Sequence, residues 1–166
     1  MTAAEIQRLL GLEPLEHEGG YFAETHRATH TLTAGSVGGE WPDSRALATA
    51  IYYLLTPETF SALHRLRADE VFHFYLGDPV EMLQLLPGGE GRIVTLGTDL
   101  AAGMRPQVVV PRGVWQGTRL MPGGAMALLG TTMSPGFDPR DFDLGRRQAL
   151  IAGYPAYRER ILALTR

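Results

Sequence analysis

The chain has 166 residues and a formal net charge of −3, and it contains neither cysteine nor lysine. The lack of cysteine excludes disulfides, thiolate metal sites and a cysteine nucleophile, and the lack of lysine excludes Schiff-base chemistry, including that of pyridoxal phosphate. The basic residues are all arginines scattered among acidic ones, so no basic stripe indicates nucleic-acid binding.

The first predicted element is a short helix over residues 3–10. Thr2 and Glu5 stand three residues apart in a capping-box pattern, and apolar side chains then recur on one face. Gly11 follows the last apolar residue and is typical of a helix end. We expect this helix to cover part of the core.

A strand is predicted next, within residues 18–27. The segment begins at a Gly-Gly turn and then alternates between polar and aromatic side chains, so one face should be solvated, with His26 and His30 on that face. Residues 31–44 hold three glycines and few packing residues, which indicates a loop or a loosely paired hairpin. Residues 46–55 are mostly apolar on both faces, and this predicts a buried strand.

The most informative stretch is residues 61–77, which places His64, Glu70 and His73 in an otherwise apolar and aromatic run. Groups that can bind a metal or move a proton therefore lie on a β-prone segment. Because side chains alternate along a strand, an unbroken strand would put His64 and Glu70 on one face and His73 on the other. A site that used all three would need a bulge or a bend.

Five further strands are expected downstream, at residues 80–86, 92–96, 107–110, 114–120 and 125–133. Gly/Pro turns suggest that the first two form a hairpin and that the last two form another pair. The tail is turn-rich and then shows helical spacing over residues 146–154 and 155–164. Both ends of the chain should therefore pack as caps on a β core.

These elements predict one domain with an all-β sandwich or barrel, since roughly eight strands alternate with turns and helices occur only at the ends. The single domain spans residues 1–166. Its expected parts are an N-terminal helix at about 3–10, a β core at about 20–133 and a helical tail at about 145–164.

The motifs resemble those of the cupin superfamily. His64, Glu70 and Gly77 are similar to the spaced residues of the first cupin motif, and residues 111–116 (Pro-Arg-Gly-Val-Trp-Gln) are similar to the second. The resemblance is closer to a cupin-like family of unknown function (DUF985 type) once described as predicted sugar epimerases. The segments that carry it are 18–22, 51–55, 69–75 and 135–138. The family implies a double-stranded β-helix, or cupin jelly roll, with short terminal helices, usually as a homodimer.

The departures from the cupin pattern bear on metal binding. The resemblance to metal-binding cupins implies a site of three histidines and one carboxylate. This chain keeps one of the histidines, as His64, and the carboxylate, as Glu70. Leu66 replaces one histidine and Gln116 replaces another; leucine cannot coordinate, and a neutral amide is a poor ligand beside imidazole. We therefore expect no cofactor. A divalent metal, if bound weakly, would use His64, Glu70 and Gln116.

The sugar-nucleotide epimerases share the jelly roll and resemble this chain in having a histidine near the His64 position. The resemblance implies that His64 is a base that takes a proton from the carbon beside a ketone, with a tyrosine as proton donor and an aspartate that orients the base. The candidate donors are Tyr21, Tyr53 and Tyr75, the candidate orienting residues are Asp138 and Asp141, and the candidate cations beside an enolate are Arg27 and Arg119. The residues we select as catalytic are His64, Tyr53 and Asp141, and those we select as ligand-binding are Glu70, Gln116, Tyr21, Arg27 and Phe137.

Three functions follow as hypotheses. The first is a small-molecule-binding cupin with epimerase or isomerase activity on a sugar or sugar nucleotide, with His64 as base. The second is a non-catalytic ligand-binding module, and the third is a metal-dependent cupin enzyme with a reduced ligand set. No signal-peptide pattern opens the chain and no segment has the roughly 20 apolar residues of a membrane span, so we expect a cytoplasmic protein without a membrane partner.

Overall fold

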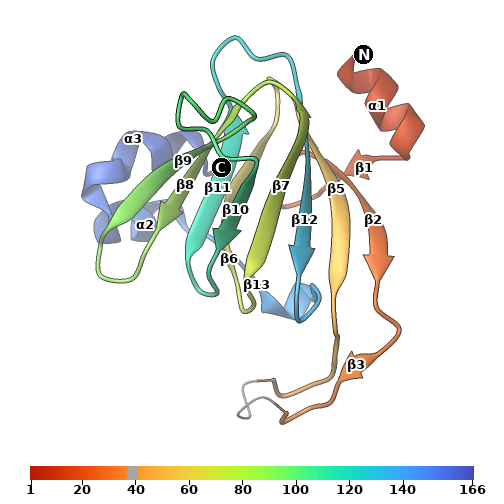
Figure 1. The fold of residues 1–166 in the computed structure, drawn as a ribbon. Helices are drawn as coiled ribbons and strands as arrows, with labels where there is room; N and C mark the ends of the chain where they lie inside the picture. The colour runs from red at the N-terminus through yellow and green to blue at the C-terminus, as the bar shows by residue number, and fades with distance from the viewer. Residues whose placement is uncertain (37–40) are drawn as a thin grey trace.

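The computed structural model describes residues 1–36 and 41–166. Two antiparallel sheets form the body of the molecule and face each other across a shared apolar core (Figure 1). Successive strands mostly alternate between the sheets, so strands that are distant in sequence become neighbours within each sheet. This gives the predicted double-stranded β-helix, or jelly roll, with short helices near the two ends of the chain.

The strands are arranged in two large sheets and one small ribbon. The six-stranded sheet has the order β1 (Glu13–Pro14), β2 (Tyr21–Arg27), β5 (Thr49–Leu55), β12 (Ala127–Met133), β7 (Glu70–Gly77), β10 (Gln107–Val110). The five-stranded sheet has the order β13 (Phe142–Leu144), β6 (Phe60–Leu66), β11 (Trp115–Leu120), β8 (Val80–Leu85), β9 (Gly91–Leu96). The ribbon pairs β3 (Thr31–Leu32) with β4 (Arg45–Ala46).

Alternation along the strands separates the core from the outer faces. On β7, Phe72 and Phe74 are buried between the sheets, whereas His73 and Tyr75 lie on the opposite, outer face. The phenylalanines join apolar residues from both sheets in the largest core cluster. Burying an aromatic or branched aliphatic side chain contributes about 1.5–3 kcal/mol, so this cluster is a major source of stability.

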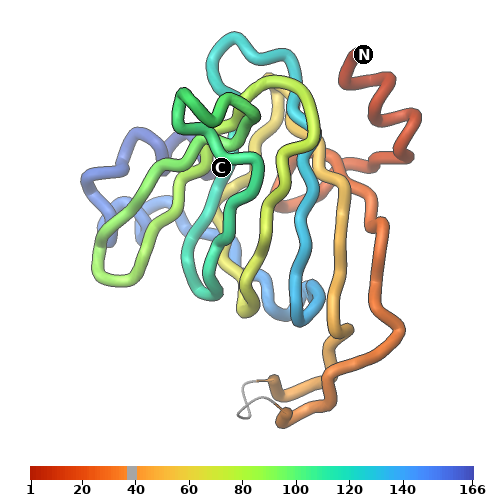
Figure 2. The backbone as a smooth tube through the Cα atoms, viewed as in Figure 1, coloured from red at the N-terminus to blue at the C-terminus, as the bar shows by residue number. Residues whose placement is uncertain are grey.

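The terminal helices cap the outer faces, as predicted. Helix α1 (Ala3–Leu10) begins at the expected capping box and buries Ile6 in a cluster with Leu54 of the six-stranded sheet. Helices α2 (Arg147–Gly153) and α3 (Arg158–Ala163) bury Leu150 and Ile161 against β6 and β8 of the five-stranded sheet. The two caps therefore lie at opposite sides of the molecule (Figure 2). Two 3-10 turns complete the helical segments, η1 (Pro139–Asp141) and η2 (Pro155–Tyr157).

The stretch that carries His64 and Glu70 is not one strand. It forms β6 and β7, which belong to different sheets and are joined by a turn at residues 67–69. The condition under which His64 and Glu70 would share one face of a single strand is therefore not met. The two residues still approach each other, because facing sheets turn their inner side chains toward one another.

The predicted pairing of residues 114–120 with 125–133 is also wrong, whereas the hairpin of β8 with β9 is confirmed. Strand β11 lies between β6 and β8, and β12 lies between β5 and β7 in the other sheet. The Pro-Gly-Gly segment between β11 and β12 is a turn, but the chain uses it to cross from one sheet to the other. Gly/Pro chemistry marks a turn without identifying the strands that it joins.

The segment 31–44 is partly the loosely paired hairpin predicted, since β3 and β4 pair over two residues each; residues 37–40 lie outside the described chain. The strand expected over 46–55 forms only as β5, because Leu47 is exposed and Ala46 belongs to β4. His26 and His30 are exposed, as expected.

Candidate ligand-binding site

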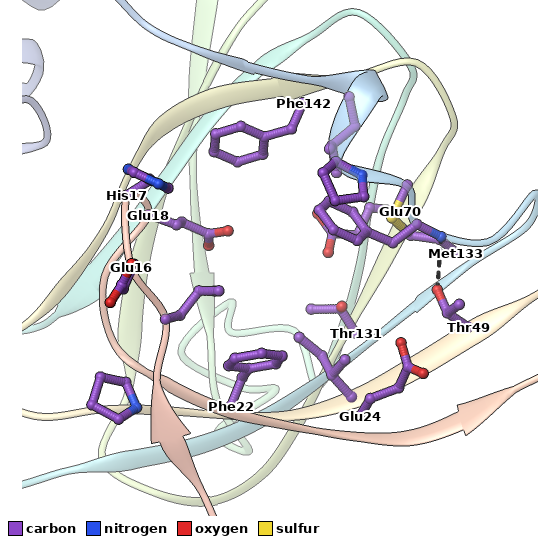
Figure 3. Close-up of a pocket in the computed structure, with 16 residues that line it drawn as sticks. Glu16, His17, Glu18, Phe22, Glu24, Thr49, Glu70, Thr131, Met133 and Phe142 are labelled. Atoms are coloured by element: carbon purple, nitrogen blue, oxygen red, sulfur yellow. Dashed lines mark hydrogen bonds between the residues drawn. The ribbon is translucent and has the colours of Figure 1, made fainter.

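A cavity of about 470 Å³ opens between the sheets at one end of the jelly roll. It is lined by inner side chains of β2, β5, β6, β7, β12 and β13, by the segment before β2 and by the segment around η1 (Figure 3). Most of the wall is apolar, with major contributions from Phe22, Ile51, Leu66, Met133, Phe137 and Phe142. The volume and lining are typical of a site for a small organic molecule.

Glu70, the first residue of β7, contributes a carboxylate to this apolar cavity. Only 7% of the residue is exposed. Gln116 Nε2 on the facing sheet donates a hydrogen bond of 2.6 Å to Glu70 Oε2. Burial raises the pKa of Glu70, the nearby His64 lowers it in part, and the like charge of Glu18 raises it further. The site thus contains a carboxyl group that takes up a proton more readily than an ordinary glutamate.

His64 lies beside this pair but behind the cavity wall. It is 2% exposed, and its Nδ1 is 2.8 Å from the carbonyl oxygen of Ala62. A carbonyl only accepts, so Nδ1 carries a proton and donates to it. Phe142 stacks on the imidazole with ring centroids 5.0 Å apart and also lines the cavity. One face of the imidazole is therefore covered by a cavity-lining ring.

Glu18 contributes a second carboxylate from the segment before β2. Ser61 Oγ donates to Glu18 Oε1 at 2.6 Å, and the Tyr53 hydroxyl donates to the backbone oxygen of Gly19 at 2.8 Å. Burial, followed by the charge of Glu18, raises the pKa of Tyr53 well above its ordinary value. Gly20 has a φ of +75°, and a Cβ there would lie 2.8 Å from the Tyr53 ring, so glycine is needed where this segment passes over the tyrosine.

Of the proposed ligand-binding residues, the structure brings Glu70 and Gln116 together and places Phe137 in the cavity wall. Glu70 and Phe137 line the cavity, and Gln116 holds Glu70 from behind without lining it. His64, expected to point into the same cavity, does not line it either, because Phe142 occupies that part of the wall. His73 lies on the other face of β7, as side-chain alternation predicts, and its Nε2 is 3.2 Å from Thr132 Oγ1.

The other candidates lie elsewhere, for identifiable reasons. Tyr21 packs with the α1 cluster on the outer face, because its neighbour Phe22 takes the inward position on β2. Tyr53 is inward but 1% exposed and covered by the segment that includes Gly20. Arg27 lies at the end of β2, where it forms an ion pair of 2.6 Å with Glu24.

Asp141, the proposed orienting residue for His64, is instead engaged by an arginine. Arg45 Nε and Nη2 donate to its two carboxylate oxygens at 2.7 and 2.9 Å. Arg119, named beside a possible enolate, pairs with Glu81 at 3.5 Å on the five-stranded sheet. Neither residue is among those that line the cavity.

Several cavity residues were not singled out from the sequence. Glu18 and Phe22 lie within the Glu-Gly-Gly-Tyr-Phe segment that carried the family resemblance, so that segment held the signal. Thr131 and Phe142 gave no comparable signal, because nothing in a run of apolar and small residues identifies which inward positions adjoin an unfilled space.

The donor set does not match a tight metal site. Within residues 1–36 and 41–166, no group of three or more histidine, aspartate or glutamate side chains is placed to hold a metal ion. Leu66 contributes hydrocarbon to the wall, and the Gln116 amide presents its N–H group to Glu70. Of the four cupin ligand positions, one imidazole and one carboxylate remain, fewer than the three or four ligands that such sites use.

The fold and the cavity define a jelly-roll protein with space for a small molecule between its sheets. The model of the Cupin superfamily (DUF985) matches residues 4–145, so the chain belongs to this family. In the described part of the chain, no helix has the length and apolar character needed to cross a membrane.

Relatives share both sequence and fold with the chain. An uncharacterized protein of Saccharomyces cerevisiae is 30% identical over 132 residues, which are 75% of this chain and 66% of that protein, slightly less than two thirds. An X-ray structure of a protein from Shewanella oneidensis has 35% identity and a TM-score of 0.87, and the match covers 100% of this chain and 98% of that chain. A hypothetical protein from Leishmania major has 30% identity and a TM-score of 0.89, with 99% of each chain covered.

Oxalate decarboxylase of Bacillus subtilis shares the fold alone. It has 15% identity and a TM-score of 0.54, and the match covers 92% of this chain and 37% of that chain. Function must therefore be argued from the site.

Proposed function

We propose that the protein binds a small organic molecule in the cavity between its sheets. The observation that carries this proposal is the placement of the buried Glu70 carboxylate in a largely apolar space of about 470 Å³. Such a space offers an apolar ligand body a large buried area, and a few polar groups orient it. A carboxylate held by Gln116 is a fixed partner for a polar group of the ligand.

The charges around the cavity favour a ligand without phosphate groups. Four glutamates and no arginine occur among the described lining residues. The diphosphate of a sugar nucleotide would meet like charges there, and like charges across an interface are unfavourable. The sugar-nucleotide form of the epimerase hypothesis therefore has less support from this cavity than binding of a neutral or positively charged molecule.

A cavity-filling substitution tests the binding proposal. In Ile51→Trp, the larger side chain fills part of the cavity, whereas Ile93→Trp makes the same change at an exposed position on β9. A set of small neutral and cationic molecules should raise the Tm of the wild type and of Ile93→Trp, because ligands that bind only the native state stabilise it. The shifts should be lost in Ile51→Trp. Equal shifts in both variants would place binding outside the cavity and contradict the proposal.

Proton-transfer catalysis of the isomerase class is a second candidate, and the raised pKa of Glu70 beside His64 favours it. In this scheme the Glu70 carboxylate takes a proton from the carbon beside the ketone of the ligand, which leaves an enolate. After exchange with solvent, the carboxyl group returns a proton to that carbon. Incubation with keto-sugars in deuterated water should then show deuterium incorporation that Glu70→Gln abolishes. Binding without incorporation would favour the non-catalytic module.

A further inference from the structure

Two carboxylates face each other across the cavity. Figure 3 shows Glu18 and Glu70 extending toward its centre from opposite sides, with Glu18 on the segment before β2 and Glu70 on β7. Their repulsion is large enough to contribute to the raised pKa of Glu70. Two like charges held around one space are unfavourable unless something of opposite charge lies between them.

The chain neutralises this pair only in part, since the nearby His64 lowers the pKa of Glu70 but the pKa stays raised. Within the described residues, neither carboxylate forms an ion pair with an arginine. Arg27 is engaged by Glu24 at the rim. Arg166 approaches the Glu18 segment, but it donates to the backbone oxygens of His17 and Glu18, at 2.7 and 3.2 Å. The negative charge thus remains available to a molecule that enters the cavity.

Hydrogen-bond acceptors are also in excess beside Glu70. Gln116 is 1% exposed, and its Oε1 has no hydrogen-bond partner among the described residues. A buried acceptor without a donor costs about 1–3 kcal/mol, so the deficit around this carboxylate is one of donors. Because Gln116 does not line the cavity, a ligand can relieve this shortage only by donating its own N–H groups to the Glu70 carboxylate.

The remaining walls suit the body of an organic cation. Phe142 and Phe22 lie on opposite sides of the cavity in Figure 3, and Phe137 also lines it. Aromatic faces attract a cation by about 0.5–2 kcal/mol, the larger value applying where the site is desolvated. Apolar walls alone would accept any hydrocarbon, but rings combined with two carboxylates that have no arginine partner among the described residues select for positive charge.

We infer that the ligand of this cavity is an organic cation, such as an arylammonium or alkylammonium compound, whose charged group lies between Glu18 and Glu70. This inference rests on the proposed function and specifies its ligand class. It applies whether or not the ligand is chemically changed.

Cation binding should depend on pH. The groups that face Glu70 are His64 on β6, Glu18 on the segment before β2, and Tyr53 on β5. Because the pKa of Glu70 is raised, a fraction of the free protein carries a proton there, and an entering cation displaces it. Affinity for the cation should therefore rise with pH through the titration of Glu70, with proton release on binding.

Three probes of similar size separate charge from shape: benzylammonium, benzyl alcohol and benzoate. Calorimetric titration of the full chain should show benzylammonium binding about tenfold tighter than benzyl alcohol, with benzoate weakest. Glu70→Gln and Glu18→Gln should each reduce the preference for benzylammonium and leave benzyl alcohol nearly unchanged. Glu90→Gln, at an exposed turn, is the matched control and should behave as the wild type.

The outcomes distinguish this inference from the proposed function. If benzyl alcohol or benzoate binds as well as benzylammonium, and Ile51→Trp abolishes that binding, the cavity is a ligand site but the inferred preference for cations is wrong. Retention of the full preference in both Glu18→Gln and Glu70→Gln would also overturn the inference. If none of the probes binds at roughly 10 mM, where even very weak sites fill, both proposals fail.

Discussion

Two buried carboxylates on inner segments of the jelly roll differ in the groups that surround their charges. Asp141 receives two hydrogen bonds from the guanidinium of Arg45, and both residues are almost completely buried. Glu70 receives hydrogen bonds from the neutral groups of Gln116 and Thr131, and its charged neighbours are His64, which lowers its pKa, and Glu18, which raises it. The charge of Asp141 is balanced by an arginine, whereas that of Glu70 is balanced only in part.

The difference separates a structural acid from a functional one. The Arg45–Asp141 pair ties the segment around η1 to β4, and the Trp41 ring lies 5.6 Å from the Arg45 guanidinium. Such a pair holds a loop in place and offers nothing to a solute. Glu70 is held by neutral groups, and its pKa stays raised because His64 offsets the burial of its charge only in part. A buried charge that the chain compensates only in part, more than burial alone, identifies the candidate site.

Breaking the balanced pair should have the largest effect. Arg45→Met removes both hydrogen bonds to the buried Asp141 and leaves it only the longer ion pair with Arg67, at 3.5 Å. Removal of one partner of a buried pair costs about 3 kcal/mol, roughly 10 °C in Tm for a chain of this size. Thermal unfolding should show this loss, whereas Arg65→Met, which breaks an exposed pair with Asp143, should change Tm little. The double variant Arg45→Met/Asp141→Leu should recover much of the loss. A small effect of Arg45→Met would remove the contrast with Glu70.

This comparison also marks the limits of the sequence. Alternation and turn chemistry predicted the strands and the inward position of Glu70, because these depend on neighbouring residues. The sequence assigned Asp141 a role beside His64, since it carries no sign that Arg45, 96 residues earlier, lies against that carboxylate. Tyr21 and Phe22 were equally aromatic, and only the register of β2 decides which one faces the cavity.

The unbalanced acid should respond to substitution in the opposite direction. Glu70→Gln keeps an oxygen that can accept from Gln116 and removes a charge whose burial is unfavourable, so the variant should be more stable than the wild type at neutral pH. The pKa of Glu70 is raised in the folded state. Its contribution to stability is therefore fully present below the unfolded pKa and is lost as the pH rises through the folded pKa. The advantage of Glu70→Gln should vanish in acid and grow toward neutral pH.

Chemical denaturation at several pH values measures this difference, with Glu90→Gln as the exposed control. A Glu70→Gln variant that is less stable than the wild type at neutral pH would show that the carboxylate is compensated inside the chain. The distinction between the two acids would then have no basis.

The smallest effect belongs to Asp138, which lies beside the balanced pair. Hydrogen bonds from Arg140 hold the pKa of this carboxyl well below its usual range, with a further contribution from Arg45. A depressed pKa gives stability that is present above the unfolded pKa and lost as the pH falls through the folded one. Asp138→Asn should thus be less stable than the wild type by about 1 kcal/mol or less at neutral pH, since this pairing is partly exposed. The difference should shrink in acid, as the wild-type carboxyl takes up a proton. The stabilities of Glu70→Gln and Asp138→Asn should both approach that of the wild type at low pH and depart from it in opposite directions as the pH rises. Stability curves that depart in the same direction would contradict the assignment of Asp138 to the fold and of Glu70 to the ligand.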